Sequence, residues 1–130
     1  MKNRNLSKQK GRKHIPLNKG KEDKQLTIER NGIRYSILRT KKNILCYNAI
    51  EHCVRENKSF DKLKTKDYEM IGVLTGTDKE NVRSTLGGIM RGRLLGTEKK
   101  FFIELLIAFG ITVGAVERFP FLKIEHASAI

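Results

Sequence analysis

YEMIGVLTGTDKENVRSTL, residues 68–86, is the stretch that decides the expected fold of this chain. Tyr68, Ile71 and Leu74 recur at the spacing of one helix face, which predicts an apolar helix. Gly76 follows, and glycine readily adopts the left-handed backbone conformation that ends a helix and turns the chain tightly. The stretch therefore predicts two short helices joined by a tight turn.

The second helix of this stretch is expected to begin at Thr77. Thr77 followed three residues later by Glu80 matches a capping box, in which two side chains satisfy two backbone N–H groups reciprocally. Asp78 lies in the same turn, where the positive end of a helix favours a carboxylate. One face of the helix is apolar and should reach the core: Val82, Leu86 and Ile89. The opposite face carries polar side chains: Lys79, Asn81, Arg83 and Ser84.

This arrangement resembles the helix-turn-helix superfamily. With Gly76 at the turn, the pattern places a small residue at Gly72 and buried aliphatic residues at Ile71 and Val82. It expects an apolar side chain at residue 85, where the chain has Thr85, so two registers of the second helix remain open. The resemblance implies that this helix enters the major groove of duplex DNA, where arginine pairs with guanine and asparagine with adenine. The base-reading residues would be Lys79, Asn81, Arg83 and Ser84.

The net charge of the chain favours an anionic partner. Lys and Arg number 27 against 14 Asp and Glu, which gives a formal charge of +13 and a pI of about 10. Residues 1–24 hold nine of the basic residues and are expected to form a flexible basic arm before a single domain over residues 25–130. The predicted phosphate contacts are Lys8, Lys10, Arg12, Lys13, Arg91 and Arg93. This charge favours DNA binding over an ordinary corner between two packed helices.

The rest of the chain predicts an α+β fold, mainly α with a small β-hairpin and a helix-turn-helix core of about four helices. Asn31 and Gly32 lie between two alternating runs in residues 25–38, the pattern of a hairpin with a type I′ turn. Helices are expected over residues 42–57, 66–74 (capped by Thr65) and 98–109 (opened by Thr97), with Phe60 and Leu63 as core residues. A short strand over residues 121–124 is expected to pair with the hairpin.

Two features are each open to two interpretations. Gly87 and Gly88 either end the second helix of the helix-turn-helix or allow another group to approach its backbone closely. The helix over residues 98–109 is apolar nearly all round. Its large side chains belong by default to the core, and alternatively to a two-fold interface of a homodimer: Phe101, Phe102, Leu105, Leu106 and Phe109.

No residue pattern in the chain predicts catalysis, a cofactor or a metal ion. Cys46 and Cys53 lie two helical turns apart, about 10 Å along the axis, so free thiols in a reducing cytoplasm are expected. His14, His52 and His126 lack the paired spacing of zinc ligands and are expected at the surface. The carboxylates of the expected capping turn would suit Mg²⁺ in a nuclease, but capping already accounts for them.

The sequence therefore predicts a non-enzymatic, sequence-specific protein that binds double-stranded DNA in the cytoplasm, at the nucleoid. The longest apolar run, residues 101–109, is far shorter than the roughly 20 residues of a membrane-spanning helix, so no membrane span is expected. The alternatives are an RNA- or ribosome-associated protein that binds through the arm and the hairpin, and a module that docks an acidic protein partner.

A second resemblance concerns the biological setting. The order GTDKENVR at residues 76–83, followed by Arg91, Arg93 and two phenylalanines at 101 and 102, is similar to small regulatory or accessory proteins of conjugative transposons, including the RteC type. This resemblance implies a transcriptional regulator or a mobile-element accessory factor.

Overall fold

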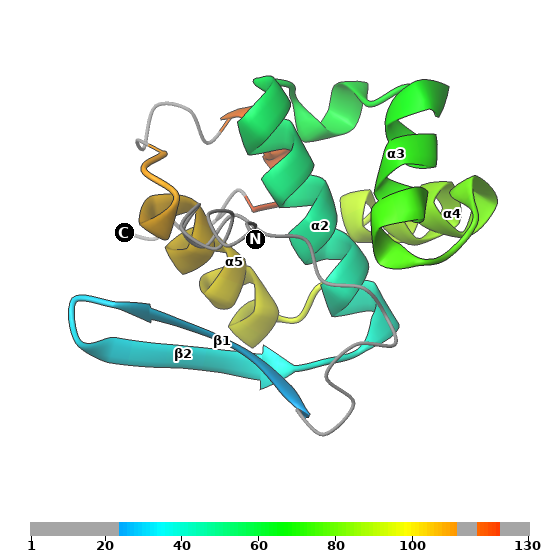
Figure 1. The fold of residues 1–130 in the computed structure, drawn as a ribbon. Helices are drawn as coiled ribbons and strands as arrows, with labels where there is room; N and C mark the ends of the chain where they lie inside the picture. Colours follow the sequence, from blue (N-terminus) through cyan, green and yellow to red (C-terminus); the bar gives the residue numbers. More distant parts are fainter. Residues whose placement is uncertain (1–23, 112–116, 123–130) are drawn as a thin grey trace, which may run out of the picture.

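The computed structural model describes residues 24–111 and 117–122, and this part of the chain is mainly helical with one small hairpin (Figure 1). The helices are α2 (Lys41–Glu56), α3 (Thr65–Thr75), α4 (Lys79–Met90) and α5 (Gly96–Ala108). The hairpin strands are β1 (Gln25–Arg30) and β2 (Ile33–Leu38), and the short 3₁₀ helices are η1 (Phe60–Lys62) and η3 (Pro120–Leu122). The predicted fold class is confirmed.

The hairpin turns at Asn31 and Gly32, as the sequence predicted. Both residues have positive φ angles, 53° and 78°, as a type I′ turn requires. The two strands pair antiparallel along their whole length. Leu26 and Ile37 are buried, and Figure 1 shows the hairpin lying against α5. The hairpin gains its stability from this packing, because two strands alone are marginal in water.

Helix α2 passes through the middle of the molecule (Figure 1). It begins after Thr40, whose hydroxyl accepts a hydrogen bond from the backbone N–H of Asn43 at 3.2 Å. It ends at Asn57, which adopts the left-handed conformation with a φ angle of 56°. All side chains from residue 43 to residue 53 are buried, so α2 is the central element on which the others pack. Leu63, in the connection to α3, is a core residue as predicted.

The strand predicted over residues 121–124 is wrong for the part that the structure describes. Phe121 and Leu122 belong to the 3₁₀ helix η3 and are buried in the core instead of pairing with the hairpin. Aromatic packing fixes this segment, because the ring centroids of Phe60 and Phe121 lie 4.3 Å apart and Phe119 is fully buried. Phe60 is thus the core residue that the sequence predicted.

Helix α5 is apolar nearly all round because other parts of the chain cover it. The hairpin packs on α5, and η3 also contacts it. The core side chains of α5 are Phe101, Phe102, Leu105 and Leu106, with Phe109 partly buried at its end. The core interpretation of these residues is confirmed. They are not exposed for a two-fold contact, so the homodimer stays a prediction and would need another surface.

Helices α3 and α5 begin earlier than the sequence predicted, so Thr65 and Thr97 are not their caps. The cap positions are Lys64 and Leu95, and the backbone N–H of each donates to a carboxylate three residues further on, at 2.9 Å. The accepting carboxylates are those of Asp67 and Glu98. An acid at the third helical position satisfies a backbone group of the first turn without a hydroxyl at the cap.

Candidate nucleic-acid interface

The crossing of α3 and α4 has the close approach that a small residue at position 72 predicts. A Cβ atom added to Gly72 would lie 2.6 Å from the backbone oxygen of Thr77 and 3.4 Å from Cγ2 of Val82. Gly76 has a φ angle of 95°, and its N–H donates to the carbonyl of Gly72 at 2.7 Å. Gly72 therefore allows the close crossing of the two helices, and Gly76 adopts the conformation of the turn, as the pattern predicted for these two positions.

The cap of α4 lies one residue later than the sequence predicted, at residue 78 instead of Thr77, and the Thr77–Glu80 capping box is wrong. The cap is Asp78, whose carboxylate accepts a hydrogen bond from the backbone N–H of Asn81 at 2.8 Å. Thr77 lies in the turn before the helix, and its hydroxyl accepts from the side-chain amide of Asn81 at 3.1 Å. Glu80 is not the cap, and it lies in the first turn of α4, where the positive end of the helix favours a carboxylate.

The register of α4, which Thr85 left open, is set by its apolar residues. Val82, Leu86 and Ile89 are buried against the core, and Thr85 is half-buried at the edge of this face. The core position after Val82 therefore belongs to Leu86, four residues on, because side chains four apart in a helix share a face.

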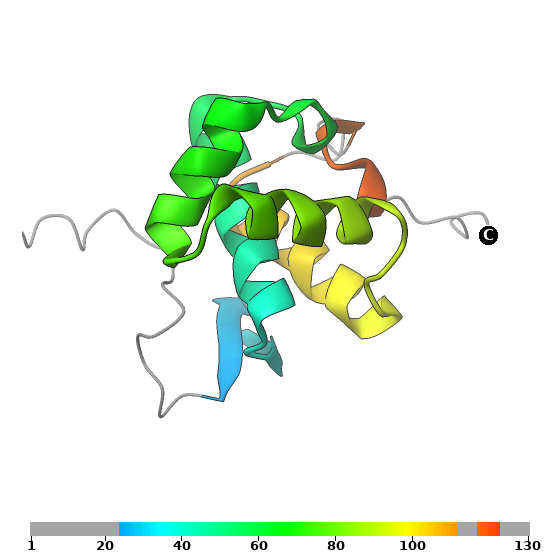
Figure 2. The same cartoon turned by 90° about the vertical axis from the view of Figure 1, so that its right-hand side faces the viewer.

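The outer face of α4 is free of other described segments. Figure 2 shows the helix lying across the front of the molecule. Its outer residues recur at helical spacing and are exposed, except for the half-exposed glycine: Glu80, Arg83, Ser84, Gly87 and Arg91. This convex, uncovered rod has the dimensions that a major groove admits.

Of the predicted base-reading residues, Arg83 and Ser84 lie on this outer face, and Lys79 and Asn81 contact other elements. The amide oxygen of Asn81 accepts from Nζ of Lys41 at 3.3 Å, in addition to its contact with the turn. Nζ of Lys79 pairs with Glu69 of α3 at 3.2 Å. Asn81 thus contacts both the turn before α4 and the first turn of α2.

The two glycines at residues 87 and 88 lie inside α4, which continues to Met90, and arginine side chains cover them. A Cβ atom added to Gly87 would lie 3.3 Å from Nη1 of Arg91, and one added to Gly88 would lie 3.2 Å from Cδ of Arg93. Gly92 then ends the helix with a φ angle of 95°. The second interpretation of the glycines, a close approach to the backbone, is therefore confirmed, and the approaching groups are the arginines predicted to hold phosphates.

The end of the predicted arm, Lys24, is held beside the segment that joins β2 to α2. The backbone N–H of Arg39 donates to the carbonyl of Lys24 at 3.0 Å, and Lys41, two residues beyond Arg39, contacts Asn81 of α4. The remaining arm residues, 1–23, lie outside the described residues, and with them the predicted phosphate contacts Lys8, Lys10, Arg12 and Lys13.

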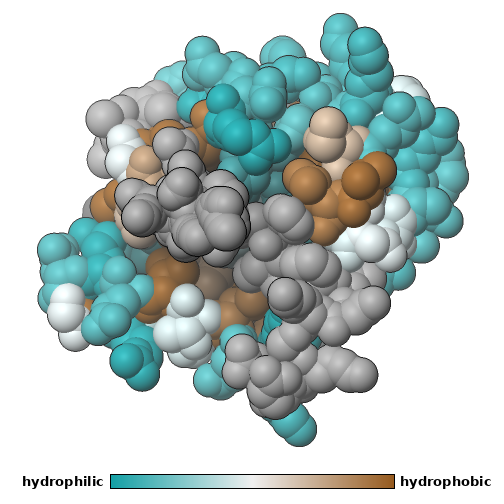
Figure 3. Space-filling model, viewed as in Figure 1, coloured by the Kyte–Doolittle hydropathy of each residue, from teal (hydrophilic) through white to brown (hydrophobic). Residues whose placement is uncertain are grey.

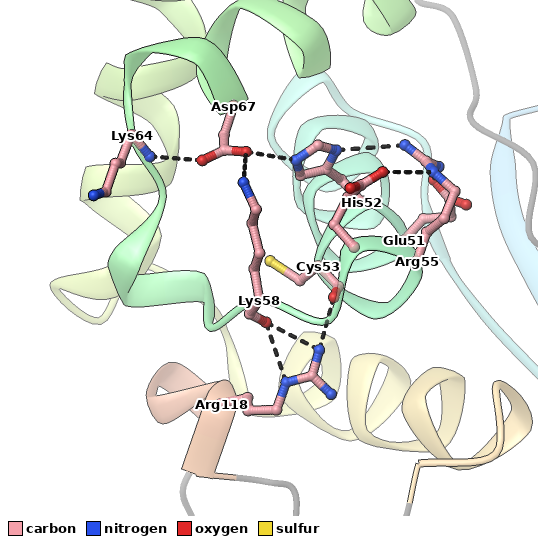
Figure 4. Close-up of polar contacts among 9 residues, drawn as sticks. Glu51, His52, Cys53, Arg55, Lys58, Lys64, Asp67 and Arg118 are labelled. Atoms are coloured by element: carbon pink, nitrogen blue, oxygen red, sulfur yellow. Dashed lines mark hydrogen bonds and ion pairs between the residues drawn. The ribbon is translucent and has the colours of Figure 1, made fainter.

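A buried polar cluster behind α3 was missed by the sequence analysis, and it corrects the surface position expected for His52 (Figure 4). His52 is only 4% exposed, and its Nε2 lies 2.9 Å from Oδ1 of Asp67. With the proton on Nε2, the neutral ring donates to Asp67, and Nδ1 accepts from Arg55 at 3.4 Å. Arg55 also pairs with the buried Glu51. The sequence feature that could have predicted this cluster is the set of polar residues one turn apart along the buried side of α2.

Asp67 is the centre of this cluster. Nζ of Lys58 donates to its carboxylate at 2.6 Å. Burial alone would raise the pKa of Asp67, but hydrogen bonds from Lys58, from a backbone N–H and from the imidazole outweigh it and lower the pKa to about 2. The ionised carboxylate thus connects the start of α3 to α2 and fixes the helix against which α4 packs.

Both cysteines lie in the hydrophobic core. Cys46 and Cys53 are free and buried, as expected, and burial raises the pKa of Cys53 to about 12. Within residues 24–111 and 117–122, no group of three or more His, Cys, Asp or Glu residues could hold a metal ion. No helix in the same part of the chain is long and apolar enough to span a membrane. His14 and His126 lie outside the described residues.

The surface beside the helix pair is hydrophilic, with one apolar patch near α3 (Figure 3). Met70 and Val73 are 47% and 77% exposed on the outer side of α3. On α4 the exposed residues Arg83 and Ser84 are polar.

Comparison of the chain with protein-family models, curated proteins and solved structures found no match.

Proposed function

We propose that this protein is a non-enzymatic, sequence-specific DNA-binding protein that places the outer face of α4 in the major groove of duplex DNA. The observation that chiefly supports the proposal is the outer face of α4, which no described segment covers and which Gly72 and Gly76 hold at a close crossing against α3. A transcriptional regulator or a mobile-element accessory factor would both use such a surface.

The outer face supplies both kinds of contact that DNA recognition needs. Arg83 and Ser84 point outward near the start of the helix, where base edges are contacted in helix-turn-helix complexes. Arg91 and Arg93 lie at the other end, over the glycines of the helix, and would contact phosphates. The excess of positive charge in the chain supports the same partner and predicts that affinity falls steeply as salt is raised.

The proposal is tested by selecting bound sequences from a random duplex pool with the full chain, and then measuring affinity for the best duplex. Arg83→Ala should weaken this binding roughly tenfold or more and relax the base preference, because an arginine that pairs with a guanine carries sequence information. Arg34→Ala is the matched control, because Arg34 is exposed on the hairpin, away from α4.

Three results would contradict the proposal. The first is that no duplex sequence is enriched from the pool. The second is that Arg83→Ala binds the best duplex as tightly and selectively as the wild type. The third is that a structured RNA outcompetes every duplex and Arg34→Ala causes the larger loss, which would support RNA binding through the hairpin.

A further inference from the structure

Glu80 is the only acidic residue within α4, and it lies on the outer face proposed to meet DNA. Its side chain is 64% exposed. A carboxylate at this place repels phosphates, so it lowers the affinity for every duplex regardless of sequence. The positive end of α4 favours an acid in its first turn, and on a reading face the same carboxylate also affects which bases are accepted.

Neither packing nor side-chain capping engages this carboxylate. The cap of α4 is Asp78, which alone accepts the hydrogen bond from the backbone N–H of Asn81. The carboxylate of Glu80 contacts Arg83, with Oε1 2.7 Å from Nη2. Both side chains are more than half exposed, and ion pairs of this kind contribute little to stability.

We propose that Glu80 is a specificity-determining residue that accepts a hydrogen bond from the N4 amino group of a cytosine, while Arg83 donates to O6 and N7 of a guanine. The inference rests on the proposed function. An ionised carboxylate can only accept hydrogen bonds, and cytosine N4 is an amino donor in the major groove. The acceptors O4 of thymine and O6 of guanine would be repelled at the same position.

The contact between the two side chains sets where their bases lie. Residues three apart on a helix are neighbours, and Glu80 and Arg83 already meet in the free protein. Two groups this close reach bases in the same base pair or in neighbouring pairs. The selected site should therefore contain a guanine with a cytosine opposite or beside it.

The ion pair in the free protein is compatible with this role, because it is exposed and exchanges readily for base contacts. While unbound, each charge serves as the partner of the other. On a wrong sequence the carboxylate meets an acceptor and has no donor, so Glu80 discriminates mainly by penalising the wrong bases.

The test is selection from a random duplex pool with the full wild-type chain and with Glu80→Ala and Glu80→Gln. Glu80→Ala should lose the cytosine preference, by roughly tenfold, while its affinity for mixed-sequence DNA rises. Glu80→Gln should shift that position towards adenine, because a glutamine amide pairs with N6 and N7 of adenine. Glu56→Gln is the charge-matched control, because Glu56 is an exposed acid at the far end of α2. This control variant should change the affinity slightly for every duplex and retain the preference for cytosine in the selected site.

The inference is overturned if both Glu80 variants keep the wild-type base preference and change only the overall affinity, as Glu56→Gln does. The outcome for Arg83→Ala separates this failure from that of the proposed function. If Arg83→Ala loses the guanine and the Glu80 variants lose nothing, the proposed function stands and the role of Glu80 does not. If the wild type enriches no sequence, both fail.

Discussion

The buried carboxylate of Asp67 predicts how the stability of the protein depends on pH. Its pKa is about 2 in the folded chain, against 3.8 for an ordinary aspartate, which corresponds to about 2 kcal/mol of stability. Because the folded pKa is the lower one, this contribution is complete above about pH 4. It is lost as the pH falls towards 2 and the carboxylate becomes protonated.

Asp67→Asn should therefore lower the free energy of unfolding by about 2 kcal/mol at pH 7, as measured by urea denaturation. The difference between the variant and the wild type should shrink between pH 4 and pH 2. The exposed Asp61 provides the control, because Asp61→Asn removes an equal charge without touching the cluster. A difference for Asp67→Asn that stays constant down to pH 2 would show that the carboxylate is not held ionised by its neighbours.

The substitution Gly72→Ala tests how closely α3 and α4 cross. The added Cβ would lie 2.6 Å from the backbone oxygen of Thr77, so α3 and α4 would have to move apart. The cost of such overpacking, about 1–3 kcal/mol, should exceed the gain of about 1 kcal/mol that alanine brings to a helix. Urea denaturation measures the net loss.

Gly96→Ala at the start of α5 is the matched control for this substitution. A Cβ there would meet no atom within 4 Å, so the variant should be as stable as the wild type or slightly more stable. If Gly72→Ala were as stable as Gly96→Ala, the close crossing of the two helices would be wrong.

Among the elements, the start of α4 offers a test of two capping arrangements. The structure assigns the cap to Asp78, so Asp78→Ala should destabilise the protein by about 1 kcal/mol. The capping box read from the sequence assigns a share of the capping to Glu80, whose carboxylate points instead to Arg83. Glu80→Ala, which removes the acceptor that the capping box needs, should therefore change the unfolding free energy much less than Asp78→Ala does. Equal losses for the two substitutions in urea denaturation would favour the capping box.

The elements themselves could be predicted from the sequence because their signals are local. The positive φ angles at Asn31 and Gly32 follow from residue type alone, and so does the turn at Gly76. Helix starts were less accurate, because a backward-reaching carboxylate or an aspartate can cap a helix as well as a threonine does. The 3₁₀ helix at Phe121 was missed because its conformation depends on a ring contact with Phe60, which is distant in sequence.

The candidate site could be predicted only in part, for the same reason. Arg83 was correctly placed on the outer face, since helical spacing from Val82 fixes its direction. Asn81 was not correctly placed on that face, because its amide contacts Lys41, a residue 40 positions away. The buried pair of His52 and Asp67 likewise joins two helices, and no local pattern predicts which polar side chains will meet.

For the molecule as a whole, the arrangement separates a core side from a side that is open to a partner. The hairpin and η3 pack on α5 and complete the core there, whereas the outer side of α4 remains uncovered by any described segment (Figures 1 and 2). Lys24, where the predicted basic arm joins the domain, is held beside Arg39 in the segment between β2 and α2.

The most direct test of DNA binding through α4 is a map of backbone amide chemical shifts in the full chain during titration with its best selected duplex. We predict that the largest changes fall in residues 79–93, on α4 and the arginine loop that follows it. The hairpin strands at residues 25–38 should change little. Largest changes in the hairpin, or on the outer side of α3 around Val73, would contradict the account, because α4 would then not be the helix that meets the duplex.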